Sequence, residues 1–288
     1  MKAGRKEAMK ERKGNNMNGP GMETRIAAVE TAGFRMDYFR FGRGGKTLVI
    51  LPGLSVDSVI KYADTVAEAY RGFAEKYTVY VFDRRKGLPA VYPVSRMAED
   101  TAAAIRALGL TDIYLFGVSQ GGMIAMAAAA AEPELVRKMV LGSTAARMDR
   151  ERYRTVGRWV ELAEGGDAEG LYLAFGEAVY PPEAFEKSKG LLAAAAASVT
   201  REDLGRFVIL AEGMKGFDMT EKLKAVACPV LVIGSADDRV LGADAAGQIA
   251  GLLKDRTDCE LYMYDGFGHA AYDTAPDYKE RILRFLGK

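Results

Sequence analysis

Short apolar segments that alternate with longer helical segments are the feature of this sequence that most restricts its fold. Examples are Thr47–Leu51 (TLVIL), Tyr77–Phe82 (YTVYVF), Ile113–Val118 (IYLFGV) and Pro229–Gly234 (PVLVIG). Strands of a parallel sheet are buried on both faces, so they read as continuous apolar runs, and their connections need crossover helices. The alternation therefore predicts an α/β protein whose mostly parallel sheet is covered by helices on both faces.

The same patterns give the expected order of elements along the chain. Eight strands are predicted, at residues 24–30, 34–41, 47–51, 77–82, 113–118, 138–141, 229–234 and 260–264. Helices are predicted between them at residues 62–76, 97–108, 120–131, 243–253 and 276–286. We expect the first two strands to be joined by a turn near Gly33.

The alternation stops between the sixth and seventh predicted strands. From Arg147 to Ala225 the sequence has several helical stretches and no convincing strand, so we expect a helical cap over 147–225. It is inserted between two core segments, 23–146 and 226–288. Residues 1–22 are polar, charged and without hydrophobic periodicity, which predicts a disordered tail.

Composition and charge exclude several classes of protein. Forty Lys and Arg face 39 Asp and Glu, and this balance argues against a dedicated nucleic-acid binder. The single histidine rules out zinc sites that need two or three imidazoles. Cys228 and Cys259 are expected to be reduced thiols. The longest apolar runs are far shorter than the roughly 20 residues of a membrane span, and no secretory signal is visible, so we expect a cytoplasmic protein.

The strongest chemical signal is Gly117-Val118-Ser119-Gln120-Gly121, which matches the pattern G-x-S-x-G. A buried strand precedes it and a helix follows, so the chain must reverse within a few residues. Such a turn forces its central residue into a strained conformation and exposes the serine hydroxyl above the sheet. We expect Ser119 to be a nucleophile. The alternative is a glycine-rich turn that binds phosphate at a helix N-terminus.

A serine nucleophile needs a base, and the imidazole needs an acceptor that fixes its tautomer. His269 is the sole histidine, and it lies in a glycine-rich loop after the last predicted strand. The loop after strand 229–234 offers Asp237 and Asp238, of which one is expected to be the acid. Activity is then expected to fall at acidic pH, because a protonated imidazole cannot accept the serine proton.

An oxyanion needs two hydrogen-bond donors near Ser119. The backbone N–H of Gln120 is the expected first donor. The second is expected from the loop Pro52-Gly53-Leu54-Ser55, and we choose the N–H of Leu54. A simple Pro-Gly turn would explain the same residues.

From about residue 24 to its C-terminus, the chain resembles α/β-hydrolase-fold serine hydrolases with a helical cap. The resemblance rests on Leu51-Pro52-Gly53, Gly117-Val118-Ser119-Gln120-Gly121, Asp238-Arg239-Val240 and Gly268-His269-Ala270-Ala271-Tyr272. It implies an eight-stranded α/β-hydrolase fold with the cap after the sixth strand, and it favours Asp238 over Asp237 as the acid. Asp83-Arg84-Arg85, placed after strand 77–82, resembles the D-x-R-G loop of many members but continues as Lys86-Gly87-Leu88.

The resemblance implies a hydrolase of esters or related acyl bonds that works through an acyl-enzyme and without a cofactor. Aromatic residues in the expected cap, such as Trp159 and Phe175, suggest a small to medium apolar substrate. A carbon–carbon bond hydrolase of ring-fission products is an alternative with the same triad. A hydrolase-fold protein that binds a small ligand without turning it over is another. The expected partner is a small-molecule acyl substrate, with no nucleic acid and no membrane span, and a homo-oligomer is left open.

Overall fold

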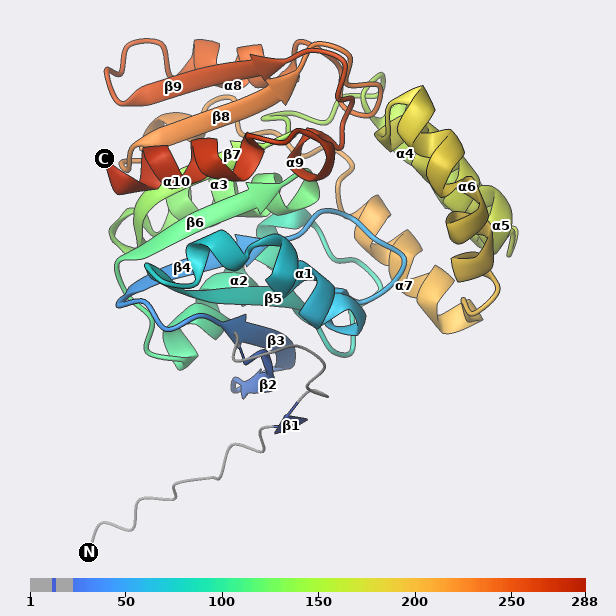
Figure 1. The fold of residues 1–288 in the computed structure, drawn as a ribbon, viewed down its shortest axis with the longest axis horizontal. Coiled ribbons are helices and arrows are strands. Elements are labelled where there is room, and N and C mark those ends of the chain that lie inside the picture. Colours follow the sequence, from blue (N-terminus) through green and yellow to red (C-terminus); the bar gives the residue numbers. More distant parts are fainter. Residues whose placement is uncertain (1–11, 14–22) are drawn as a thin grey trace, which may run out of the picture.

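The computed structural model describes residues 12–13 and 23–288 (Figure 1). Their strands are β1 (Arg12–Lys13), β2 (Arg25–Glu30), β3 (Arg35–Phe41), β4 (Lys46–Leu51), β5 (Tyr77–Arg85), β6 (Ile113–Val118), β7 (Val136–Gly142), β8 (Val230–Ser235) and β9 (Cys259–Tyr264). Their α-helices are α1 (Ala63–Ala69), α2 (Val94–Ala107), α3 (Gln120–Ala131), α4 (Tyr153–Glu164), α5 (Ala168–Val179), α6 (Pro182–Ala196), α7 (Arg201–Glu212), α8 (Ala245–Leu252), α9 (Ala271–Thr274) and α10 (Tyr278–Gly287).

Within the described residues the strands form one sheet in the order β1-β2-β3-β5-β4-β6-β7-β8-β9. The pairs from β5 to β9 are parallel, whereas β2 and β3 add to one edge in antiparallel register. All eight predicted strands are present, and β1 is an additional short one. The predicted tail otherwise lies outside the described residues.

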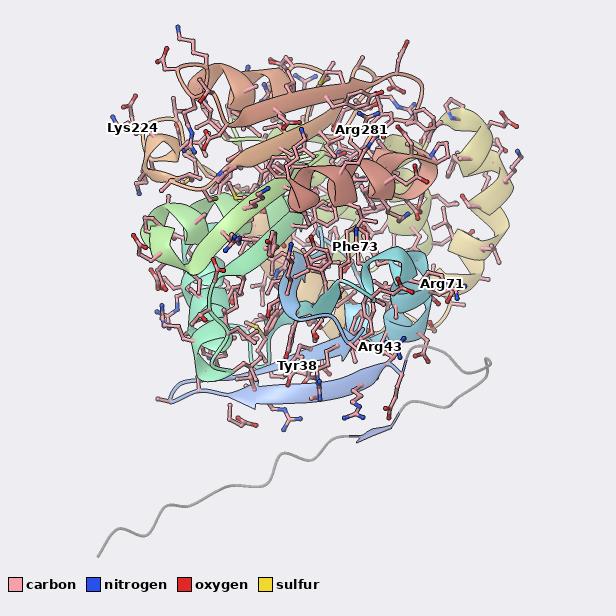
Figure 2. The ribbon with its side chains drawn as sticks, turned by 60° about the vertical axis from the view of Figure 1, so that its left-hand side comes forward. Tyr38, Arg43, Arg71, Phe73, Lys224 and Arg281 are labelled. Carbon is pink, nitrogen blue, oxygen red and sulfur yellow. The ribbon has the colours of Figure 1, made fainter. Side chains whose placement is uncertain are left out.

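The two faces of the sheet carry separate hydrophobic clusters because neighbouring residues of a strand point to opposite sides. Val49 belongs to the cluster under α2, α3 and α8, and Leu48 and Ile50 belong to the cluster under α1 and α10. Figure 1 shows these helices on the two faces of the sheet. In Figure 2 side chains fill the space between the layers, with Phe73 in the interior. Every residue of the central strand β6 is buried.

Two predicted boundaries are wrong. The helix expected over 62–76 stops at Ala69 and continues as a short 3-10 turn, Arg71–Phe73. Strand β5 does not end at Phe82 but runs to Arg85, because its last residues pair with β3. The Asp83-Arg84-Arg85 segment therefore lies in a strand, at a point where the register with β3 is irregular.

Helices α4 to α7 lie between β7 and β8 in the sequence and beyond the carboxyl ends of the parallel strands in space (Figure 1). They are packed as the pairs α5 with α6 and α4 with α7. Among the described residues no helix is long and apolar enough to cross a bilayer.

The entry into α3 requires glycine, which gives a first prediction. A Cβ on Gly121 would lie 2.0 Å from the carbonyl oxygen of Leu51, which is backbone and cannot move aside. We expect Gly121→Ala to lower the free energy of unfolding by about 1–3 kcal/mol, measured by urea denaturation. Gly247→Ala is the control, since that helical glycine has open space around its Cβ position. It is expected to raise stability by up to about 1 kcal/mol. Equal effects of the two substitutions would contradict the close approach.

Candidate active site

Ser119 lies at a sharp turn between β6 and α3. Its φ of 53° and ψ of −121° lie outside the usual regions for a residue with a side chain. The turn is held on both sides, because Ser119 N donates to Gly142 O (2.9 Å) and Thr144 Oγ1 donates to Ser119 O (2.7 Å). A Cβ on Gly117 would lie 2.4 Å from the carbonyl oxygen of Gly121, so both small residues of the motif are required.

His269 is buried, and its Nδ1 lies 2.8 Å from Asp238 Oδ2. The other carboxylate oxygen of Asp238 accepts from the N–H groups of Val240 (2.8 Å) and Leu241 (2.9 Å). Burial alone would raise the pKa of Asp238. The charge and hydrogen bond of His269, together with these N–H groups, outweigh it and hold the pKa below its usual value. Asp238 is therefore a carboxylate that fixes a proton on Nδ1 and leaves Nε2 free to accept.

The two aspartates that the sequence left as alternatives, Asp237 and Asp238, have different hydrogen-bond partners in the structure. Asp237 does not contact the imidazole. It accepts hydrogen bonds from Ser235 Oγ (2.6 Å) and from the N–H of Gly268 (3.0 Å), the residue before His269. Asp237 thus ties the histidine loop to the end of β8, whereas Asp238 bonds the imidazole itself.

Ser119 and His269 line the same pocket, although they make no hydrogen bond to each other within the described part of the chain. Such contacts often tighten only when substrate binds. The rest of the lining is almost entirely apolar: Gly53, Leu54, Val156, Trp159, Phe175, Val179, Met214, Val240 and Tyr272. The free volume is about 20 Å³, little more than a water molecule needs.

The two expected oxyanion donors lie beside this pocket. A Cβ on Gly53 would lie 3.2 Å from Ser119 Cβ, so the loop that carries Leu54 passes directly over the serine. Leu54 and Gln120 are buried, yet neither N–H donates to another described residue. Buried N–H groups nearly always have a partner, so two unpaired ones next to a serine are typical of an anion-binding position.

Sequence reasoning missed a set of part-buried polar contacts that join α5 and α7 to the loop after β4 and to the end of β5. Asp83 accepts from Arg206 of α7 and from Ser58 Oγ, each at 2.5 Å. Asp57 accepts from Tyr172 of α5 (2.8 Å) and Tyr62 (2.9 Å) and pairs with Lys61. No local pattern marks Arg206 or Tyr172, because each partner lies more than a hundred residues away.

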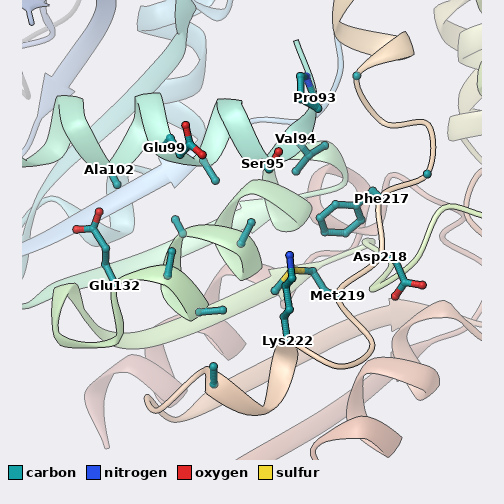
Figure 3. Close-up of a pocket in the computed structure, with 18 of the residues that line it drawn as sticks. Pro93, Val94, Ser95, Glu99, Ala102, Glu132, Phe217, Asp218, Met219 and Lys222 are labelled. Carbon is teal, nitrogen blue, oxygen red and sulfur yellow. The ribbon is translucent and has the colours of Figure 1, made fainter. Parts of the chain in front are cut away.

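Two further hollows lie outside the site. One of about 520 Å³, shown in Figure 3, lies between α2, α3 and the segment 213–225, and its lining combines several alanines with charged residues such as Glu99, Glu132 and Lys222. It contains none of the predicted site residues. A second, of about 1160 Å³, follows α4 and α5 and includes Arg150, Arg158 and Trp159. Trp159 lines both this groove and the pocket of Ser119.

Comparisons with known proteins agree with the fold. A protein-family model for the alpha/beta hydrolase fold matches residues 46–171. A relative from Agrobacterium fabrum, named as a carbamate hydrolase RutD, is 26% identical over 202 residues, covering 69% of this chain and 76% of the relative.

Two solved structures are similar over most of their length. MGS-M2, an alpha/beta hydrolase from a deep-sea metagenome library, superposes with a TM-score of 0.79 at 22% identity, covering 91% of this chain and 97% of that one. A thermophilic esterase from Thermogutta terrifontis gives 0.73 at 19% identity, with 91% and 97% covered. The chain therefore has the α/β-hydrolase fold, as its sequence motifs predict.

The strain at Ser119 gives a second prediction. Glycine tolerates a positive φ, whereas a side chain there costs about 1–3 kcal/mol. The relief of strain is partly offset by the greater entropy that glycine gives the unfolded chain. We therefore expect a net free energy of unfolding about 1 kcal/mol higher for Ser119→Gly than for Ser119→Ala, measured by urea denaturation. The same pair at Ser188, inside α6, is the control, and there the order is expected to reverse. An alanine variant that is the more stable at both positions would contradict a strained turn.

Proposed function

We propose that this protein is a serine hydrolase that cleaves a carboxylic ester, or a related acyl bond, of a small to medium apolar substrate. One observation carries the proposal: Ser119 at its strained turn and His269, whose Nδ1 is bonded to Asp238, line a single pocket. The fold and the names of the relatives, a carbamate hydrolase and an esterase, support hydrolysis of an acyl bond.

In the proposed mechanism, Ser119 Oγ attacks the carbonyl carbon while His269 Nε2 takes the hydroxyl proton. Asp238 stabilises the imidazolium that forms. The N–H groups of Leu54 and Gln120 hold the negatively charged oxygen of the tetrahedral intermediate. The intermediate then collapses to an acyl-enzyme, and the imidazolium gives its proton to the leaving alcohol oxygen. A water molecule, deprotonated by the same imidazole, releases the acid and restores Ser119.

The lining of the pocket favours an apolar acyl group over the dienoate of a carbon–carbon hydrolase. A substrate carboxylate needs a charged or hydrogen-bonding partner when it is buried. The pocket offers aliphatic and aromatic side chains instead, from α4 and α5 above and from the loops of the sheet below. We propose that α4 to α7 form the cap of this pocket, because Val156, Trp159, Phe175 and Val179 of these helices close it.

Labelling by a fluorophosphonate probe tests the mechanism, because the probe reacts with activated serines. We expect the wild type to be labelled, Ser119→Ala to give no labelling, and His269→Ala to slow it by about 10²-fold or more. The measurement is the rate of probe incorporation at a fixed concentration. An unlabelled wild type that is well folded would contradict the proposal and favour a ligand-binding protein.

The neighbouring aspartates supply a matched control for this experiment. Asp238→Asn is expected to slow labelling strongly, since the carboxylate no longer sets the tautomer of His269. Asp237→Asn has the same change in charge and volume one residue away, and it is expected to have the smaller effect. The reverse order would assign the acid to Asp237.

The size of the pocket gives a further prediction. Val156 lines it, and Val160 is a buried valine of the same helix that does not. We expect Val156→Ala to raise kcat/KM for a hexanoate ester relative to an acetate ester by about 10-fold, since each methylene accommodated is worth about 1–3 kcal/mol. Val160→Ala should leave the ratio unchanged. The ratio is measured with a panel of p-nitrophenyl esters. Equal ratios for the two variants would show that the acyl group does not bind next to Val156.

A further inference from the structure

The buried guanidinium of Arg84 connects the two loops that carry the expected oxyanion donors. Its Nη2 donates to the carbonyl oxygen of Pro52 (2.8 Å) and to Oε1 of Gln120 (3.0 Å). Pro52 begins the loop that contains Leu54, and Gln120 carries the other donor on its own backbone. One side-chain nitrogen therefore bonds both loops.

The register of β5 is irregular at Arg84. Phe82 pairs with Tyr38 and Arg85 pairs with Met36, so two residues of β5 lie opposite one residue of β3. Arg84 is buried and bonds the loops at Pro52 and Gln120, whereas Arg85 donates to Asp100 (3.4 Å) and to the carbonyl oxygen of Gly33 (3.1 Å). The two arginines are adjacent, but only one reaches the site.

The side chain of Gln120 is held at both ends. Its Oε1 accepts from Arg84, and its Nε2 donates to the carbonyl oxygen of Leu210 in α7 (2.7 Å). Gln120 is fully buried, so this amide has no water with which to exchange partners. A continuous chain of hydrogen bonds thus runs from α7 through Gln120 and Arg84 to Pro52.

Burying the guanidinium of Arg84 carries a large desolvation cost. Burial lowers the pKa of its guanidinium to about 10, and its Nε has no partner among the described residues. Its guanidinium makes no direct ion pair with a described residue, since the nearby carboxylate of Asp83 bonds Arg206 and the backbone N–H of Arg84. A buried cation whose partners are a carbonyl and an amide oxygen contributes little to stability for its desolvation cost. It does fix the separation of the two loops and adds positive charge beneath them.

We propose that Arg84 is a positioning residue that holds the N–H groups of Leu54 and Gln120 in the geometry that binds the oxyanion. Gln120 extends this control to α7. This inference rests on the proposed function, because it requires that an oxyanion forms at Ser119. Since the donors act on charge that develops in the transition state, the loss of Arg84 lowers kcat more than it raises KM.

A trifluoromethyl ketone is the appropriate probe, because Ser119 adds to it and creates the oxyanion without turnover. We expect Arg84→Gln to weaken binding of the ketone by about 10- to 100-fold and to lower kcat for a p-nitrophenyl ester by a similar factor. This loss is no larger than the loss in kcat expected when one oxyanion donor is removed. KM should change by less than about threefold. Arg85→Gln is the matched control and should leave ketone binding and kcat within about threefold of the wild type.

The outcomes separate the inference from the proposed function. If the wild type neither binds the ketone nor hydrolyses esters, the proposed function fails. If the wild type is active and a folded Arg84→Gln binds the ketone as tightly as Arg85→Gln does, the positioning role is wrong. A loss of thermal stability without a selective loss of ketone affinity also overturns it. Should Arg84→Gln fail to fold, Arg84→Lys applies the same criteria, with the fluorescence of Trp159 reporting whether α4 is in place.

Discussion

The close approach between the start of α3 and the end of β4 is the constraint on which the rest of the site depends. At Gly121 the helix backbone passes so near Leu51 that no side chain fits between them. This contact brings the serine turn against the loop that begins at Pro52. Gly53 completes the approach from the other side, next to Ser119 Cβ. Ser119 and Gln120 thereby become neighbours of the loop that carries Leu54, although about 65 residues of sequence separate the two segments.

The buried charged groups around Ser119 differ in whether an opposite charge compensates them. Asp83 and Arg206 compensate each other in a part-buried pair, in which the arginine is 20% exposed. Asp57 is satisfied by two tyrosines and a lysine, which hold its pKa below the usual value against the opposing effect of burial. The guanidinium of Arg84 has no directly bonded carboxylate among the described residues. The first two groups attach α5 to the loop after β4 and α7 to the end of β5, whereas the Arg84 guanidinium bonds the loops at Pro52 and Gln120.

The sequence was sufficient for the eight strands and for the turn at Ser119, because each rests on a local pattern: an apolar run, or glycines at fixed spacing. The sequence also favoured Asp238 over Asp237, but only through a family resemblance and not through a physical argument. The structure places Asp238 next to the imidazole of His269. The roles of the site residues stay predictions. The end of β5 could not be predicted, because a polar segment such as Asp83-Arg84-Arg85 becomes a strand only through its pairing with β3. The contact of Gln120 with Leu210 spans ninety residues and depends on how α7 packs. Local spacing carries no information about such a pair.

For the proposed reaction, the attachment of α4 to α7 would constrain how a substrate reaches Ser119, because the pocket holds little more than a water molecule. Displacing the whole segment would break the part-buried contacts of Asp57 with Tyr172 and of Asp83 with Arg206. Rotating Trp159 and Phe175, whose rings are 4.5 Å apart, breaks no charged contact. Trp159 also borders the outer groove along α4 and α5, so its rotation would join that groove to the pocket. Under the proposed function, side-chain rotation is therefore the route that breaks fewer contacts, and it would open space only for a small or narrow acyl group.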